Sequence, residues 1–400
     1  MQLKRHQILA ISGILVIIIA VAAVAGSWLY IRHRNGNLSN STSSSASGNQ
    51  NSSKTPIEGF VDMGVQADYL QALPFAPVNL LELGSQADAF SATVVNASWA
   101  QLEPTQGSYN WSVIDNSLAT ISTYNQQHPN TPLAAKFRIF GGNTAPNWAK
   151  SIDGSPLTLT NAKGETVIVG RWWTSAYDAA WKAFQTALAE RYDNNPLVKE
   201  TAITSCASLT GEPFVLPHTA TAISTLESAG WTSALQQQCL SNALNDYSAW
   251  KNTYVDFAFN PFVAINQNSG TLDVAFTQSI MQACVESASR GGPHCILGNN
   301  DLGLTNTGFS NTGLIDVYHE FNTLETQNHT MNVYFQMYNP TITNSATLAC
   351  QAIQTAIEHH ARSIELWPPR GHLKGFSSIS ESTLASWSYA LKHQSSLTCS

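Results

Sequence analysis

Residues 92–127, ATVVNASWAQLEPTQGSYNWSVIDNSLATISTYNQQ, contain the pattern that decides the fold. Ala92–Ala97 is a short apolar and β-branched run, which is typical of a buried strand. A polar segment with Pro104 and Gly107 follows, and Ser112–Gln127 then has apolar residues at helical spacing. This stretch therefore predicts a strand followed by a helix, the unit from which parallel sheets are built.

The same alternation recurs along the chain. The eight predicted strands are Phe60–Gln66, Ala92–Ala97, Ala134–Phe140, Glu200–Ser205, Val255–Phe259, Cys295–Gly298, Val333–Met337 and Ser363–Trp367. The predicted helices are Ser112–Gln127, Ala176–Tyr192, Thr232–Trp250, Val274–Ser289, Thr312–Gln327 and Thr347–His360. Because eight predicted strands alternate with helical segments, the sequence predicts an α/β fold with one closed (β/α)8 TIM barrel over residues 57–400. An open doubly wound sheet is the alternative, but the Gly-rich phosphate turn that it uses after the first strand is missing from the sequence.

The longest insertion, residues 141–173, contains LTLTNAKGETVIVG at 157–170. This segment predicts a β-hairpin that turns at Ala162–Gly164. Trp172 and Trp173 follow the hairpin, either as a stacking platform for a sugar or as core residues.

The N-terminal part of the chain is predicted to lie outside the barrel. A short basic segment, residues 1–7, precedes residues 8–31, which carry no charge and are long enough to cross a bilayer. We expect an uncleaved transmembrane signal-anchor helix with the barrel outside the cell; the alternative is a cleaved signal peptide and a secreted protein. Residues 32–56 are rich in Ser and Asn and predict a flexible linker.

Charge and composition exclude some classes of function. Without residues 1–34, the chain has 15 Lys and Arg against 26 Asp and Glu, a net charge near −11. Nucleic-acid binding is disfavoured because phosphate contacts need a basic face. The 11 histidines are scattered and no metal-binding motif appears, so neither a metal nor a cofactor is expected. The sequence leaves the oligomeric state unknown.

The six cysteines all follow the linker, and their even number suggests disulfides in an oxidising compartment. Cys284 and Cys295 flank a short turn and are a natural pair. Pairs Cys206–Cys239 and Cys350–Cys399 would complete a set. The spacing alone does not fix this connectivity, and free buried thiols are the alternative.

Polar residues at the predicted strand ends are candidates for a site, because barrels place their active sites at the carboxyl ends of the strands. Amides and aromatic rings suit a neutral carbohydrate, since amides pair with hydroxyls and rings cover the apolar faces of sugars. The candidate substrate-binding residues are Trp99, Arg138, Asn260, Asn300, Asp301, Gln336, Tyr338 and Trp367.

One motif carries a family resemblance. In TVVNASWAQLEPTQGSYNWSVID, residues 93–115, the pattern W-x-x-L-E-P-x-x-G-x-Y-x-W-x-x-I-D resembles the second-strand region of clan A glycoside hydrolases, a superfamily of β-galactosidase and cellulase type. The segment TSCASLTGEPF, residues 204–214, resembles the end of the fourth strand, where that clan places its acid/base glutamate after an asparagine. Here Gly211 precedes Glu212. The resemblance implies a (β/α)8 barrel and cleavage of O-glycosidic bonds in a neutral oligo- or polysaccharide.

Glycoside hydrolysis needs two carboxyl groups, and the resemblance implies Glu212 as the acid/base residue of a retaining enzyme. The clan's nucleophile lies at the end of strand seven, where this chain has Gln336. We therefore predict Glu365 as the nucleophile, with Asp301 as an alternative. A barrel that binds carbohydrate at the cell surface without cleaving it is the rival hypothesis.

Some candidates also have structural explanations. Glu103, beside Pro104, is expected to form hydrogen bonds that hold a barrel loop. Asp301 has a structural alternative as a cap of a turn at Leu302–Thr307. Glu365 is harder to explain in this way, because an unpaired buried carboxylate is unfavourable.

Overall fold

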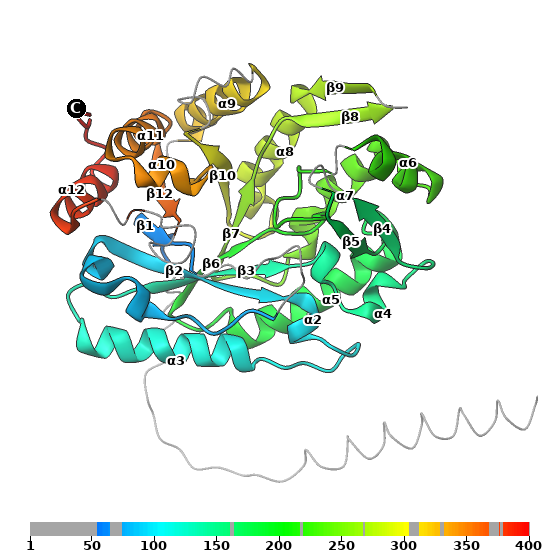
Figure 1. Ribbon diagram of the computed structural model, residues 1–400, viewed down its shortest axis with the longest axis horizontal. Coiled ribbons are helices and arrows are strands. Elements are labelled where there is room, and N and C mark those ends of the chain that lie inside the picture. Colours follow the sequence, from blue (N-terminus) through cyan, green and yellow to red (C-terminus); the bar gives the residue numbers. More distant parts are fainter. Residues whose placement is uncertain are drawn as a thin grey trace, which may run out of the picture. The chain divides into compact units, whose positions relative to one another are not determined.

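The computed structural model describes residues 54–64, 74–160, 164–216, 219–266, 269–303, 312–328, 332–367, 376 and 379–399 (Figure 1). The predicted N-terminal segment and membrane helix, residues 1–31, and most of the predicted linker lie outside these ranges. Among the helices in the described ranges, none combines the length and the apolar character that crossing a membrane requires.

The central element is a closed barrel of eight parallel strands, as predicted (Figure 1). The strands are β1 (Gly59–Asp62), β2 (Phe90–Ser98), β3 (Ala134–Phe140), β6 (Val198–Ala202), β7 (Tyr254–Ala258), β10 (Cys295–Leu302), β11 (Val333–Met337) and β12 (Ala361–Leu366). Their order around the barrel follows the chain, and β12 pairs with β1 to close it. All eight predicted strands are therefore present, with ends that shift by a few residues.

Helices connect the strands. They are α2 (Trp99–Leu102), α3 (Ser112–Gln127), α4 (Asn147–Lys150), α5 (Ser175–Tyr192), α6 (Ala220–Ser228), α7 (Ser233–Asp246), α8 (Val274–Glu286), α9 (Thr312–Asn328), α10 (Pro340–Asn344), α11 (Ala346–Glu358) and α12 (Glu381–Lys392). Four short 3-10 helices also lie in the described ranges: η2 (Leu80–Glu82), η3 (Gly84–Ala89), η4 (Gly142–Thr144) and η5 (Ala288–Arg290). All six predicted helices are present, whereas α2, α4, α6, α10 and α12 were not predicted.

Two antiparallel hairpins lie in connections between barrel strands. Strands β4 (Leu157–Thr160) and β5 (Thr166–Val169) form the predicted hairpin in the third connection. Strands β8 (Phe262–Asn266) and β9 (Ser269–Asp273) form a second hairpin, which was not predicted. Trp172 and Trp173, after the first hairpin, are buried in the core, so the packing alternative holds for both.

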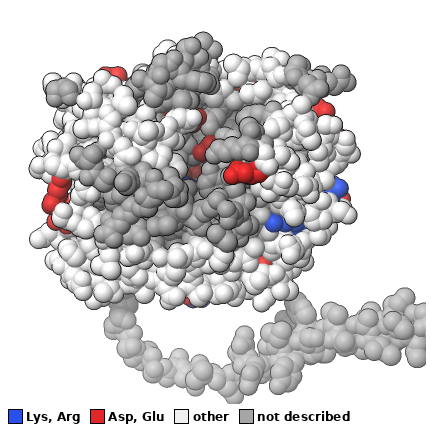
Figure 2. Space-filling view, in the orientation of Figure 1, with Lys and Arg blue, Asp and Glu red and all other residues white. Residues whose placement is uncertain are grey.

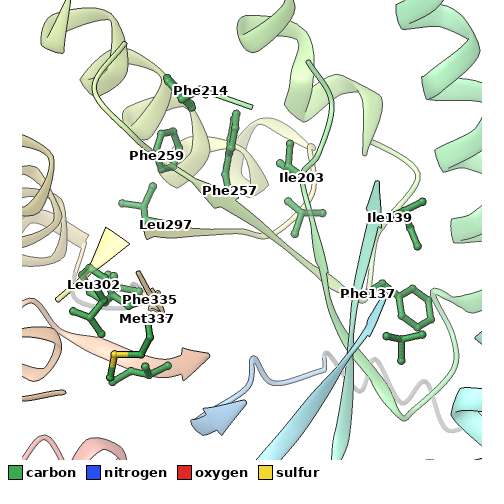
Figure 3. Close-up of a cluster of buried hydrophobic side chains, with 14 of the residues drawn as sticks. Phe137, Ile139, Ile203, Phe214, Phe257, Phe259, Leu297, Leu302, Phe335 and Met337 are labelled. Atoms are coloured by element: carbon green, nitrogen blue, oxygen red, sulfur yellow. The ribbon is translucent and has the colours of Figure 1, made fainter. Parts of the chain in front are cut away.

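An apolar layer separates the barrel from its helices. Alternate residues of β3, Phe137 and Ile139, belong to this layer, as strand geometry requires for side chains on one face. Figure 3 shows them with the equivalent residues of neighbouring strands, among them Phe257, Leu297 and Phe335. The burial of such large side chains is the main stabilising contribution to the fold, roughly 1.5–3 kcal/mol for each.

The other face of β3 points into the barrel and carries charges. The ammonium group of Lys136 lies 2.8 Å from Glu365, 3.0 Å from Asp256 and 3.7 Å from Glu200. It also lies 3.7 Å from the centre of the Tyr334 ring. Burial would lower the pKa of Lys136, but the three carboxyl groups around it raise it. The interior of the barrel thus contains a network of charged side chains that are almost completely buried.

All three predicted disulfides are present: Cys206–Cys239, Cys284–Cys295 and Cys350–Cys399. The first ties the segment after β6 to α7, the second ties α8 to β10, and the third ties α11 to the C-terminal segment. Each bridge therefore fixes a helix to a neighbouring part of the barrel.

The loop that carries the family motif is held by its glutamate. One carboxylate oxygen of Glu103 accepts a hydrogen bond from the Trp99 indole at 2.7 Å, and the other accepts one from the Gly107 amide at 2.7 Å. Gly107 adopts a φ of 74°, which favours glycine. The structural role predicted for Glu103 is confirmed.

Candidate active site

A cavity of about 610 Å³ lies at the carboxyl ends of the barrel strands. Its lining comes from β3, β10, β11, the end of β12 and the segment after β6. The face drawn in Figure 2 is hollowed near its centre, where acidic side chains gather, and few Lys or Arg side chains lie on it. A larger groove of about 930 Å³ runs along α3 and η3, and it contains none of the predicted site residues.

The cavity brings together most of the predicted site. The predicted residues that line it are Arg138, Glu212, Asn300, Asp301, Gln336, Tyr338 and Trp367. Trp367 is fixed in this position because its indole donates a hydrogen bond to the Met337 carbonyl at 2.6 Å. Tyr338 is 41% exposed, so its ring is accessible to a ligand.

Glu212 lies well beyond the end of β6, in a segment that many contacts fix. The disulfide Cys206–Cys239 holds the start of this segment. Gln236 of α7 donates to the carbonyls of Cys206 and Pro213, at 3.3 Å each. The next residue, Phe214, packs its ring against Phe257 and Phe259. These contacts position Glu212 although it does not belong to a strand.

Gly211 replaces the asparagine that precedes the acid/base glutamate in the resembling family. A Cβ atom at Gly211 would lie 3.2 Å from the Phe140 ring and 3.5 Å from Cδ of Arg138. The distance to Arg138 is ordinary van der Waals contact, whereas the distance to Phe140 is tight, so a larger side chain would require a small shift of the Phe140 ring.

The Glu212 carboxyl has the electrostatic surroundings of a proton donor. Burial raises its pKa to about 7, and the negative charge of Asp301 acts in the same direction. A hydrogen bond with Asn300 and the positive charge of Arg138 act against this shift. A substantial fraction of Glu212 is therefore protonated near neutral pH, as a general acid requires.

A β-bulge at the end of β10 shapes the opposite wall. Asn299 pairs with Phe335 and Leu302 pairs with Met337, so β10 has one residue more than β11 in this interval. Side chains alternate between faces in a regular strand, and an extra residue interrupts this alternation. As a result, the consecutive residues Asn300 and Asp301 both line the cavity. The turn at Leu302–Thr307 that Asp301 was alternatively expected to cap lies mostly outside the described residues.

Glu365 does not line the cavity. Its side chain is 1% exposed, and its two oxygens lie 2.8 Å from Lys136 and 2.5 Å from Arg138. Burial would raise its pKa, but these two cations hold it below its usual range. A nucleophile must reach the anomeric carbon, so this placement does not support the predicted role of Glu365. Both oxygens serve the barrel network, which explains the buried carboxylate in structural terms.

Two further predicted residues lie outside the lining. The Trp99 ring is 0% exposed and packs against Trp148, Tyr177 and Trp181. Trp99 was expected to contact the substrate, but its ring packs in the core instead. Asn260 is also buried, and its side-chain oxygen accepts a hydrogen bond from Asn299 at 2.9 Å. It supports the bulge instead of contacting a ligand.

Several lining residues were not predicted. They are Phe140, Thr210, Gly211, Val215 and Pro340. Phe140 ends β3, so strand-end position was a usable signal for it. Thr210 and Val215 flank Glu212 in an irregular segment, where no periodicity indicates which side chains face the cavity.

Comparisons with known proteins find a similar sequence family and similar folds. The model of a glycoside hydrolase family described as beta-galactosidase matches residues 81–205. Two solved structures of endo-glycoceramidase II from Rhodococcus sp. share the fold. The lactosyl-enzyme intermediate has a TM-score of 0.51 and 11% identity over 83% of this chain and 78% of that chain. The ganglioside GM3 complex has a TM-score of 0.50 and 13% identity over 83% and 79%.

No curated protein matches the chain significantly. The matched region, residues 81–205, contains the predicted second-strand motif and ends just before the segment that carries Glu212. The two structures, in turn, each cover 83% of this chain. Together the sequence match and the shared fold confirm the resemblance to glycoside-hydrolase barrels and support a glycosidase.

Proposed function

We propose that this chain is a retaining glycosidase that cleaves O-glycosidic bonds of a neutral oligo- or polysaccharide, with Glu212 as the acid/base residue. The observation that carries the proposal is the position of Glu212: its carboxyl faces a cavity at the carboxyl end of the barrel, and its pKa is raised to about 7. Such a group can give a proton to a departing alkoxide near neutral pH.

The cavity offers contacts that suit a neutral sugar. Arg138 lines the cavity beside Glu212 and contributes a positive charge there, although its guanidinium is largely buried. Gln336 and Asn339 add amides, and Trp367 and Tyr338 add aromatic faces. A phosphorylated ligand fits less well, because Arg138 is the single basic residue among the described residues of the lining and Glu365 already pairs with it.

We also place this activity outside the cell, on a chain anchored in the membrane by residues 8–31. The uncharged length of that segment supports the anchor. The three disulfides agree with an oxidising compartment. Fractionation of cells that express the full chain, followed by protease treatment of intact cells, tests this placement: a barrel protected from the protease contradicts it.

A panel of aryl-glycosides tests the activity. Replacing Glu212 with Gln removes the proton donor, and we expect the turnover number to fall by about 10²–10⁴-fold. Glu190→Gln, an exposed glutamate on α5, makes the same chemical change outside the cavity and serves as the control. Equal activities of the two variants would refute the role of Glu212.

A carbohydrate-binding barrel without catalysis is the second candidate, and Gln336 is the observation that favours it. Gln336 lines the cavity at the end of the seventh strand, where the resembling family has a carboxylate nucleophile. Binding of oligosaccharides by calorimetry, with no reducing sugar released over long incubation, would favour this candidate over the enzyme.

A further inference from the structure

The bulge in β10 brings a second carboxyl group to the cavity that contains Glu212. Asp301 is mostly buried, and its negative charge is the strongest charge that acts on Glu212. The residue before it, Asn300, forms a hydrogen bond with Glu212. The two carboxyl groups therefore share one part of the cavity and stand on separate elements.

Buried contacts hold the bulge in this conformation. The Asn299 side chain, fully buried, accepts hydrogen bonds from the Asp301 amide at 2.8 Å and from the Tyr318 hydroxyl at 2.9 Å. It also donates to the Phe259 carbonyl and to the Asn260 side chain, at 2.9 Å each. With so many bonds, Asn299 links β10 to β7 and α9. Asp301 is thus presented to the cavity by a rigid support, as a catalytic group requires.

The other candidates for the second carboxyl group are excluded by chemistry or by position. Gln336 has an amide, which cannot act as a carboxylate nucleophile. Glu365 is sealed in the barrel with both oxygens bound to cations. Among the described residues that line the cavity, Glu212 and Asp301 are the two that carry a carboxyl group.

We propose that Asp301 is the catalytic nucleophile, an inference that rests on the glycosidase function proposed above. In the first step an oxygen of Asp301 forms an ester bond with the anomeric carbon while the glycosidic C–O bond breaks. Glu212 gives its proton to the departing oxygen, which leaves as an alcohol. In the second step Glu212 takes a proton from water, the resulting hydroxide attacks the anomeric carbon, and the ester bond breaks to restore Asp301.

The order of ionisation agrees with these roles. Burial raises the pKa of Asp301 to about 6, below the value of about 7 for Glu212. As the pH rises, Asp301 loses its proton first, and its charge then favours the protonated form of Glu212. The ionised nucleophile and the protonated acid therefore coexist in the interval between these two pKa values.

Covalent trapping tests the assignment directly. We would first identify an aryl-glycoside that the wild-type chain cleaves, and then use its activated 2-deoxy-2-fluoro analogue as the probe, since the fluorine slows both steps and the good leaving group lets the ester accumulate. Peptide mass spectrometry of the inactivated protein should show the sugar on Asp301. A sugar on Glu365, or an active enzyme that forms no adduct and inverts the anomeric configuration, overturns the proposal.

Two variants support the trapping experiment. Asp301→Asn should lower the turnover number by about 1,000-fold or more, while Asp316→Asn, the same change at an exposed position of α9, leaves it unaltered. Azide should restore turnover to Asp301→Gly and yield a glycosyl azide of inverted configuration. If turnover depends on Glu212 but survives in Asp301→Asn, the nucleophile assignment alone fails. If the wild-type chain cleaves no glycoside, both proposals fail.

Discussion

Replacing Lys136 with Met removes the central cation of the barrel while keeping a side chain of similar length. In the wild-type chain this ammonium group lies within 4 Å of Glu200, Asp256 and Glu365, and all four side chains are at most 1% exposed. The variant leaves three carboxyl groups with Arg138 as the remaining cation of the network. We therefore expect a large loss of stability.

The size of the loss follows from the burial of the network. Removing one partner of a buried ion pair decreases the free energy of unfolding by about 3–5 kcal/mol, because the other partner stays buried without compensation. Domains have a total stability of about 5–15 kcal/mol, so the loss is a large part of the whole. The cation–π contact with Tyr334 is lost as well.

The loss should also depend on pH. The pKa of Glu200 is already raised to about 7, with burial as the main cause, and that of Asp256 is raised too. A carboxyl group whose folded-state pKa lies above its unfolded value destabilises the fold as the pH rises through the folded pKa. Without Lys136 these pKa values rise further, so the difference in stability between wild type and variant should be larger at pH 8 than at pH 5.

Urea denaturation followed by tryptophan fluorescence, at pH 5 and at pH 8, measures both effects. Lys251→Met is the matched control, because Lys251 is exposed and its substitution should change stability by less than about 0.5 kcal/mol. If Lys136→Met loses no more than the control, or if its deficit is the same at both pH values, the charged network does not contribute as we infer.

Three further predictions concern the site and its surroundings. A plot of kcat/KM against pH should be a bell that rises near pH 6, as Asp301 ionises, and falls near pH 7, as Glu212 loses its proton; a rate that still rises at pH 8 would contradict these roles. Replacing Cys206 and Cys239 with Ser opens a loop with a sequence separation of 33 and should reduce stability by about 3–4 kcal/mol together with activity. The control pair Cys284–Cys295, with a separation of 11, should reduce stability in urea melts by about 3 kcal/mol and leave kcat unaltered. Deleting residues 1–53 should give a folded fragment of unchanged activity, since residues 53–400 form one compact unit; aggregation of the fragment under oxidising conditions would show that the removed part contributes to the fold.

The sequence predicts the barrel because each strand is an apolar run with its own turn signals. The spacing in Ser112–Gln127 even gives the bounds of α3 without error. The hairpin of β8 and β9 was not predicted: β8 begins at Phe262, shortly after the predicted strand Val255–Phe259, and no second strand was expected so close to the first. Local pattern is thus sufficient where an element stands apart from its neighbours.

The site is less predictable, because it depends on contacts between distant residues. Glu212 was found from its motif, but the orientation of Asp301 follows from one extra residue in β10 relative to β11, which a single strand does not reveal. The prediction for Glu365 assumed that a carboxylate without a local partner needs a functional explanation. Its partners, Lys136 and Arg138, lie on a strand far away in the sequence.

The charged network inside the barrel also bears on how the strands find their alignment. Lys136, Glu200, Asp256 and Glu365 come from four different strands, β3, β6, β7 and β12, and meet at one height. Apolar side chains of similar size would tolerate a strand that slides by two residues, since the same faces would still be buried. A charged side chain in the same position does not tolerate this slip, because the displaced strand would bury the charge without its partner. The network therefore favours a single register of the strands around the barrel.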